Sequence, residues 1–179
     1  MKSNIELIYW DTVIYIAWLM DEQRPNHEMD GVYESARKIS QGEQKLICST
    51  IVSAQISRIR TDQPAIEKFN MFLKRRSVQY VDFENRASNL TADIIDYYNI
   101  GNKIPGKKMD FSDAQHLAVS ILYKVDAFYT FDRGKRGGMD LLSLGGNVAG
   151  HNLTICKPPL PAHLRMDLQL PAKSETYDP

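Results

Sequence analysis

The chain has little of three things that often narrow a function at once: cysteine, net charge and long apolar runs. Among its 179 residues only Cys48 and Cys156 are cysteines, which is too few for a disulfide scaffold. Each lies in an apolar, strand-like segment, so we expect two buried, reduced thiols. The 22 basic and 22 acidic side chains cancel to a formal net charge of zero. This balance excludes nucleic-acid binding through bulk positive charge, and any polyanion must bind to a local basic patch.

The longest apolar run, residues 13–20, is bounded by Asp11 and Asp21 and is far shorter than a bilayer span. The first residues show neither the apolar core nor the cleavage site of a signal peptide. We therefore expect a protein of the cytoplasm with no membrane segment. A chain of this length predicts one compact domain with a sizeable core.

Short apolar segments alternate with longer helical patterns along most of the chain. Strands are predicted at residues 5–10, 45–48, 78–83, 127–130 and 153–156, with helices at 12–20, 28–40, 50–60, 64–73, 85–98 and 113–123. Strands separated by helices need crossover connections, which favour an α/β fold: a three-layer α/β/α arrangement with a mainly parallel central sheet. Residues 1–156 form this domain, and the Pro-rich residues 157–179 are expected to be a peripheral extension.

Capping residues mark several of the predicted helix boundaries. Ser49 is expected to cap the helix that begins at Thr50, and Gly42 stands where the preceding helix should stop. Ser112 and Gln115 match a capping box, so the helix that follows is expected to begin directly after Ser112.

Three aspartates fall at the predicted carboxyl ends of strands or in the first turn of a helix. Asp11 follows the first strand, Asp132 follows the fourth, and Asp113 opens the capped helix. Each alone is explained by a local role as a cap, a dipole partner or a turn residue. Loops and helix N-termini meet at this edge of a parallel sheet, so we expect the three side chains to lie together. Three carboxylates in one place repel each other unless a cation holds them.

Four segments resemble the four motifs of the PIN-domain ribonucleases, in order and with ordinary spacing. They are IYWDT at residues 8–12, STIVSAQ at 49–55, DFSDAQHLA at 110–118 and YTFD at 129–132. The resemblance covers roughly residues 5–156 and is strongest to the VapC toxins of toxin-antitoxin pairs. It implies a PIN-like fold, a cluster of acidic residues holding Mg²⁺ or Mn²⁺, and hydrolysis of RNA phosphodiester bonds. A cognate antitoxin is the implied partner.

The resemblance carries site roles onto particular residues. Asp11, Asp113 and Asp132 are the implied metal ligands and catalytic residues, and Asp110 is a further candidate ligand. The family has a glutamate where this chain has Gln55, whose amide brings no charge and cannot act as a base. Gln55 is expected to orient a water or an aspartate from outside the metal's own ligands.

Gln55 also leaves an alternative open: a PIN-fold module that binds RNA or protein and whose catalysis is weakened or lost. A third class, the haloacid-dehalogenase-like phosphohydrolases, needs a second aspartate two positions after the first. Val13 stands at that position, which argues against this class.

Basic residues lie on both sides of the acidic motifs in the sequence. Arg133, Lys135 and Arg136 follow Asp132, while Lys107 and Lys108 precede the third motif; we expect all five to bind substrate phosphates, with strong salt dependence. His116 could be a general acid or a ligand, but its apolar neighbours favour a packed residue. The apolar faces of residues 28–40 and 64–73 fit either a homodimer, an antitoxin contact or simple core packing.

Overall fold

The computed structural model describes residues 5–59, 62–134 and 137–167. Its centre is a five-stranded sheet with the order β3-β2-β1-β4-β7, in which every pairing is parallel. The strands are β1 (Glu6–Trp10), β2 (Gln44–Ser49), β3 (Val78–Val81), β4 (Ala127–Tyr129) and β7 (Ile155–Cys156). The helices are α1 (Thr12–Leu19), α2 (Glu28–Gln41), α3 (Thr50–Ile56), α4 (Gln63–Leu73), α5 (Asn85–Ile95), α6 (Phe111–Leu122) and α7 (Ala162–Asp167).

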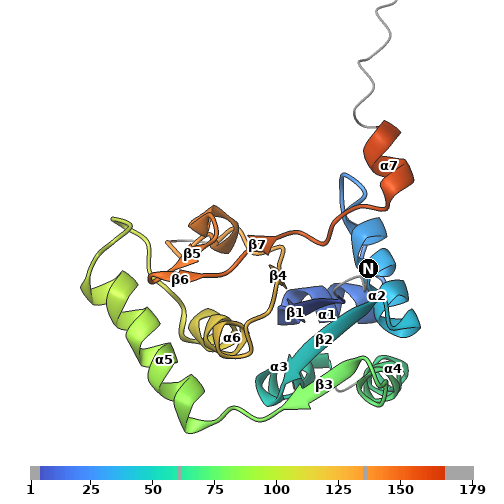
Figure 1. Ribbon diagram of the computed structural model, residues 1–179, viewed down its shortest axis with the longest axis horizontal. Helices are drawn as coiled ribbons and strands as arrows, with labels where there is room; N and C mark the ends of the chain where they lie inside the picture. Colours follow the sequence, from blue (N-terminus) through green and yellow to red (C-terminus); the bar gives the residue numbers. More distant parts are fainter. Residues whose placement is uncertain (1–4, 60–61, 135–136, 168–179) are drawn as a thin grey trace, which may run out of the picture.

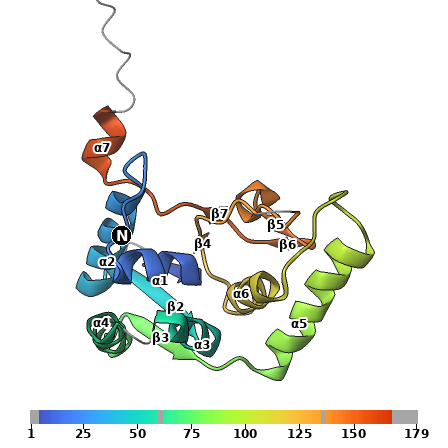
Figure 2. The same cartoon turned by 180° about the vertical axis from the view of Figure 1, so that it is seen from behind.

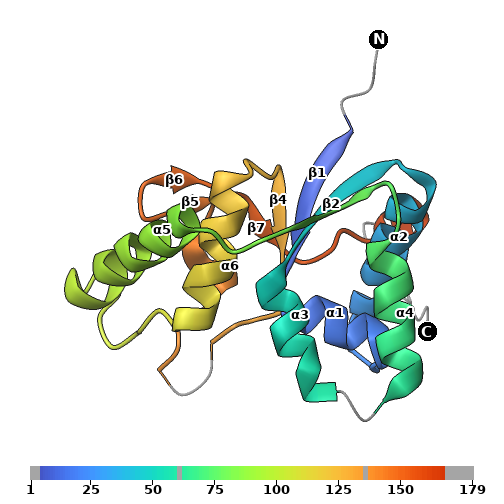
Figure 3. The same ribbon diagram turned by 90° about the horizontal axis from the view of Figure 1, so that it is seen from below.

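Helices cover both faces of the sheet, so the predicted three-layer α/β/α fold is confirmed (Figures 1 and 3). The central strand β1 explains the arrangement, because successive side chains of a strand point to opposite faces. Trp10 packs on Phe72 of α4, with ring centroids 5.7 Å apart, and Tyr9 packs on the ring of His116 in α6 at 5.7 Å. Tyr9 and Trp10 are both fully buried.

The predicted capping box at the start of α6 is wrong. Asp110 is the N-cap, its Oδ1 accepting a hydrogen bond from the backbone N–H of Ser112 at 2.8 Å, and α6 therefore begins at Phe111. The hydroxyl of Ser112 is instead engaged by the amide of Gln55, and aspartate caps helices as well as serine does. Ser49 caps α3 as predicted, accepting from the N–H of Ile51.

The structure differs from the predicted elements in several smaller ways. α3 ends at Ile56 and continues as the 3-10 turn η1 (Ser57–Ile59), while α5 continues as the π-helical turn η2 (Asp96–Ile100). Between β4 and β7 lie the 3-10 turn η3 (Leu141–Leu144) and a small hairpin of β5 (Asn147–Val148) and β6 (His151–Asn152), neither of which was predicted. Both thiols are free, but only Cys48 is buried; Cys156 is half-buried.

The chain beyond β7 crosses to α2, and α7 lies at the end of that helix (Figures 1 and 2). The backbone of Pro158 approaches Gly31 so closely that a Cβ there would lie 2.4 Å from the Pro158 carbonyl oxygen. Lys157 also forms an ion pair with Glu28, with 2.5 Å between Nζ and Oε1. Within the described ranges, no helix combines the length and apolar character needed to cross a bilayer.

Candidate active site

Asp11 and Asp132 meet at the carboxyl edge of the sheet through Thr130. Asp11 leaves β1 directly, and its Oδ2 accepts a hydrogen bond from the Thr130 hydroxyl at 2.7 Å. The same hydroxyl oxygen accepts from the backbone N–H of Asp132 at 3.0 Å, and Asp132 Oδ1 accepts from the N–H of Gly134 at 2.8 Å. Each carboxylate thus has one oxygen held by the protein and one without a hydrogen bond to any described residue.

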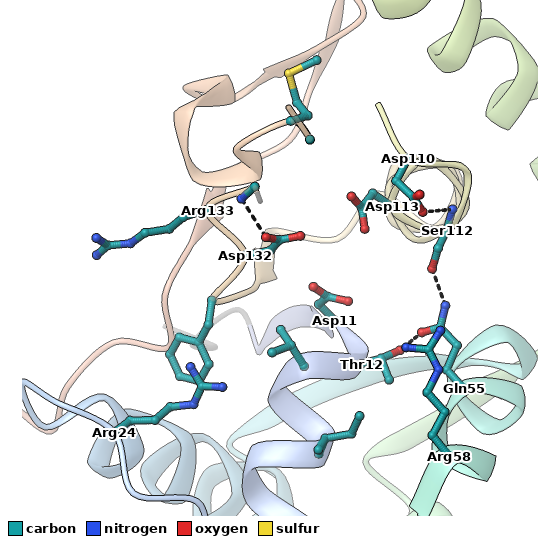
Figure 4. A pocket seen from close by; sticks show the side chains of 16 residues that line it. Asp11, Thr12, Arg24, Gln55, Arg58, Asp110, Ser112, Asp113, Asp132 and Arg133 are labelled. Atoms are coloured by element: carbon teal, nitrogen blue, oxygen red, sulfur yellow. Dashed lines mark hydrogen bonds between the residues drawn. The ribbon is translucent and has the colours of Figure 1, made fainter. Parts of the chain in front are cut away.

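Asp113, in the first turn of α6, joins these two carboxylates (Figure 4). Burial, and to a smaller extent the negative charges of Asp11, Asp132 and Asp110, together raise the pKa of Asp113 to about 7. All four aspartates line one open pocket with a volume of about 610 Å³. The structure therefore brings the three predicted aspartates together, whereas Asp110, which also lines the pocket, already serves as the cap of α6.

Asp113 is expected to make the metal-free protein less stable as the pH rises. An aspartate in the unfolded chain has a pKa of about 4, so between about pH 4 and about pH 7 the folded protein binds more protons than the unfolded chain. The free energy of unfolding therefore falls through this window and levels off above it. Asp113→Asn cannot ionise and should remove this part of the slope. Urea unfolding in the presence of a chelator, measured across the window, checks the prediction; identical pH profiles for both proteins would contradict it.

Gln55 connects three helices at the wall of the pocket. Its Oε1 accepts from the hydroxyl of Thr12 in α1, and its Nε2 donates to the hydroxyl of Ser112 in α6 (Figure 4). The imidazole Nε2 of His116 lies 3.0 Å from the same Oε1. The hydrogen bonds of Gln55 in the described structure therefore go to two hydroxyls and an imidazole, and the amide ties α3 to both neighbouring helices.

His116 is a buried member of this network, with 1% of its surface exposed, which confirms the prediction of a packed residue. Because Gln55 presents Oε1, His116 donates through Nε2–H, and its Nδ1 accepts from the Tyr9 hydroxyl at 2.8 Å. Burial lowers the pKa of His116, although the charge of Asp11 opposes this shift. The imidazole is therefore neutral, and both of its nitrogens have partners.

Comparison with known proteins gives similarity in structure alone, since no protein-family model and no curated protein sequence matches the chain. The crystal structure of VapBC2 from Rickettsia felis, bound to a DNA fragment from its promoter, aligns with a TM-score of 0.57 at 14% identity and covers 84% of this chain and 97% of that one. The crystal structure of FitAcB from Neisseria gonorrhoeae aligns with a TM-score of 0.53 at 16% identity, with the same coverage of both chains. The chain has a PIN-like fold. The resemblance found in the motifs is thus supported at the level of the fold.

The basic residues around the pocket of this PIN-like fold differ in part from those predicted. Arg133 lines the pocket, as do Arg24 and Arg58, which the sequence analysis missed. Lys107 and Lys108 are not among the lining residues; the backbone of Lys108 pairs instead with the segment at Gly137 and Met139. Lys135 and Arg136 lie outside the described residues. Arg58 follows Gln55 by three positions on one helical face, a signal that was present in the sequence, whereas Arg24 lies in a connection without such a pattern.

The acidic pocket of the PIN-like fold offers oxygen ligands but no closed metal cage. Among the residues that the structure describes, no three His, Cys, Asp or Glu side chains form a ready-made metal site. Asp11 and Asp132 each keep one carboxylate oxygen without a hydrogen bond to a described residue, and Asp113 faces the same space. Mg²⁺ commonly takes only one or two protein carboxylates and keeps several waters, so this donor set fits a hydrated hard cation.

Proposed function

We propose that this protein is a metal-dependent endoribonuclease of the cytoplasm and the toxin of a toxin-antitoxin pair. The observation that carries the proposal is the pocket in which Asp11, Asp113 and Asp132 face one another, with arginines around them. Carboxylates packed in this way need a cation, and arginines at their rim attract a polyanion. The shared fold with VapBC2 and FitAcB supports the same assignment.

Asp11, Asp113 and Asp132 would hold Mg²⁺ or Mn²⁺. When bound, the ion would lower the pKa of a water molecule and offset the charge that develops on the phosphate oxygens. Asp11 is the most rigid of the three because it follows the central strand, and Thr130 holds both the carboxylate of Asp11 and the backbone of Asp132. Asp110 uses its carboxylate as a helix cap, so we assign it a contribution of charge at the mouth of the pocket.

Substrate attraction is assigned to the basic residues that approach this pocket. Arg133 lines it directly. We retain Lys107, Lys108, Lys135 and Arg136 as predicted contacts to phosphates farther along the RNA strand. For the partner, VapBC2 and FitAcB are both complexes, and that of VapBC2 was crystallised with promoter DNA. By analogy we propose a cognate antitoxin for this chain, and a homodimer of the toxin.

The test is cleavage of single-stranded RNA by the purified chain. We expect cleavage in the presence of Mg²⁺ or Mn²⁺ and none in the presence of a chelator. RNA that stays intact with either ion, for the natural chain and for Gln55→Glu alike, would refute the nuclease assignment. RNA binding without cleavage would instead favour the alternative, a PIN-fold binding module, for which the uncharged Gln55 is the specific observation.

Gln55→Glu is expected to raise the affinity for Mg²⁺ by about tenfold, the size of effect found for groups just outside a metal's own ligands. A glutamate can accept hydrogen bonds from Thr12, Ser112 and His116, because a serine hydroxyl turns to donate, so the network survives the change. The variant then adds a negative charge beside the aspartates. Titration of the cleavage rate with Mg²⁺ measures the shift. Gln55→Met, similar in length and uncharged, is the control, and equal Mg²⁺ dependence for the glutamate and methionine variants would contradict the prediction.

A further inference from the structure

Arg58, like Arg133 and unlike Arg24, lines the pocket without an ion pair to any described carboxylate. Arg58 is also exposed. Arg24, by contrast, donates to Glu22 from Nε at 3.0 Å and from a terminal nitrogen at 2.8 Å, and lies 4.3 Å from the ring centre of Phe131. Arg24 is therefore held by the protein, whereas the guanidinium of Arg58 donates to no residue that the structure describes.

The wall that carries Arg58 has the opposite charge from the centre of the pocket. α3 runs on into η1, so Arg58 lies beside Gln55, and Figure 4 shows both on one side of the pocket. Gln55 contributes no charge, so this wall is positive. Asp11, Asp113 and Asp132 make the centre of the pocket negative. A ligand that bridges the two regions must offer an anion to Arg58 while part of it shares a cation with the carboxylates.

We propose that Arg58 binds a backbone phosphate of the RNA strand, next to the phosphodiester that lies at the aspartates. A phosphodiester strand satisfies both requirements, because its phosphates repeat at short intervals. A guanidinium also matches phosphate oxygens with two parallel N–H donors. The contact reads no base, so it contributes affinity and the position of the strand rather than sequence preference. This inference rests on the proposed ribonuclease function and assigns to Arg58 a part of its substrate site.

The experiment measures binding separately from cleavage. Labelled single-stranded RNA is titrated with the full chain in a chelator, by fluorescence anisotropy at several salt concentrations. Arg58→Ala is expected to weaken binding about tenfold, which is about 1.4 kcal/mol. It should also lower the slope of log affinity against log salt by about 0.7, the value for one phosphate contact on a single strand. Arg58→Lys should keep the salt slope but lose part of the affinity, because an ammonium cannot bind in the paired geometry.

Arg76→Ala is the matched control, since Arg76 is an exposed arginine that precedes β3. It therefore lies at the amino ends of the strands, whereas the pocket lies at their carboxyl ends. This variant should leave affinity and slope unchanged. In cleavage assays Arg58→Ala should raise KM and leave kcat nearly unchanged.

Four outcomes are distinguishable. Equal affinity and salt slope for Arg58→Ala and Arg76→Ala would overturn the proposal while leaving the nuclease function intact. If Arg58→Ala lost binding to poly-glutamate but kept binding to RNA, Arg58 would be assigned to an acidic protein partner. This outcome would overturn the proposal as well. No RNA binding by the natural chain, either in the chelator or with Mg²⁺ added, would overturn both proposals. RNA binding that depends on Arg58, in a chain that never cleaves, would support the phosphate contact and refute only the nuclease.

Discussion

Asp11→Asn is expected to reduce metal-dependent RNA cleavage by more than about a hundredfold. Loss of a group that only supports a metal ligand costs about 10–100-fold, and Asp11 is assigned as a ligand itself. Asparagine has the same shape and can still accept from Thr130, so the local structure is expected to persist. What it lacks is the negative charge and the second oxygen. Initial cleavage rates, measured over a series of Mg²⁺ and Mn²⁺ concentrations, give the size of the effect.

The matched control for this prediction is Asp93→Asn, which changes an exposed aspartate of α5. It removes one negative charge from the protein without touching the pocket, and its cleavage rate should equal that of the natural chain. Comparable rates for Asp11→Asn and Asp93→Asn would show that cleavage does not depend on Asp11. Circular dichroism of both variants separates a loss of the site from a loss of the fold.

His116→Leu is expected to lower the free energy of unfolding by about 2 kcal/mol, because it removes two hydrogen bonds that each contribute about 0.5–1.5 kcal/mol. Leucine fills a similar volume but offers neither a donor nor an acceptor. Among the described residues, the buried Tyr9 hydroxyl then keeps only Ser49 as a partner, and Gln55 Oε1 keeps only Thr12. Urea unfolding followed by circular dichroism measures the change in midpoint.

His151→Leu serves as the control for the stability measurement, since His151 is exposed in β6. A change at such a site is usually within about 0.5 kcal/mol. If His116→Leu unfolded at the same urea concentration as this control, the Tyr9–His116–Gln55 hydrogen bonds would contribute nothing to stability.

The fold was predictable where the chain carries strong local patterns. β1 and β2 each contain a continuous apolar segment because helices cover both of their faces, and helices such as α2 and α5 have clear apolar stripes. The two-residue strands β5 and β6 carry too few residues to form a pattern and exist only through their contacts. The start of α6 depended on Gln55, 57 positions away, which occupies the hydroxyl that would otherwise cap the helix. Such a competition cannot be seen in a local sequence window.

The residues of the candidate site were likewise predictable only where a local pattern in the sequence determines their position. Asp11 and Asp132 were found because a residue that follows a parallel strand must lie at its carboxyl edge. Arg24 was missed because its position depends on the path of the connection between α1 and α2, which no periodicity describes. The expectation that Gln55 orients a water or an aspartate was drawn from its chemistry alone. Its observed partners reflect the approach of α1 and α6, which only the packed structure defines.

The central place of β1 in the sheet has a consequence for how the pocket is lost on denaturation. Both edges of β1 are paired, with β2 and β4, and the N–H of Asp11 continues the pairing with the carbonyl of Tyr129 at 2.9 Å. Amides in such a position exchange with solvent only when the whole domain opens. Arg58 lies in the middle of a short, exposed 3-10 turn, which we expect to open locally at a much lower cost. Mild denaturant should therefore disorder Arg58 first, whereas Asp11 should keep its native position until the entire sheet unfolds.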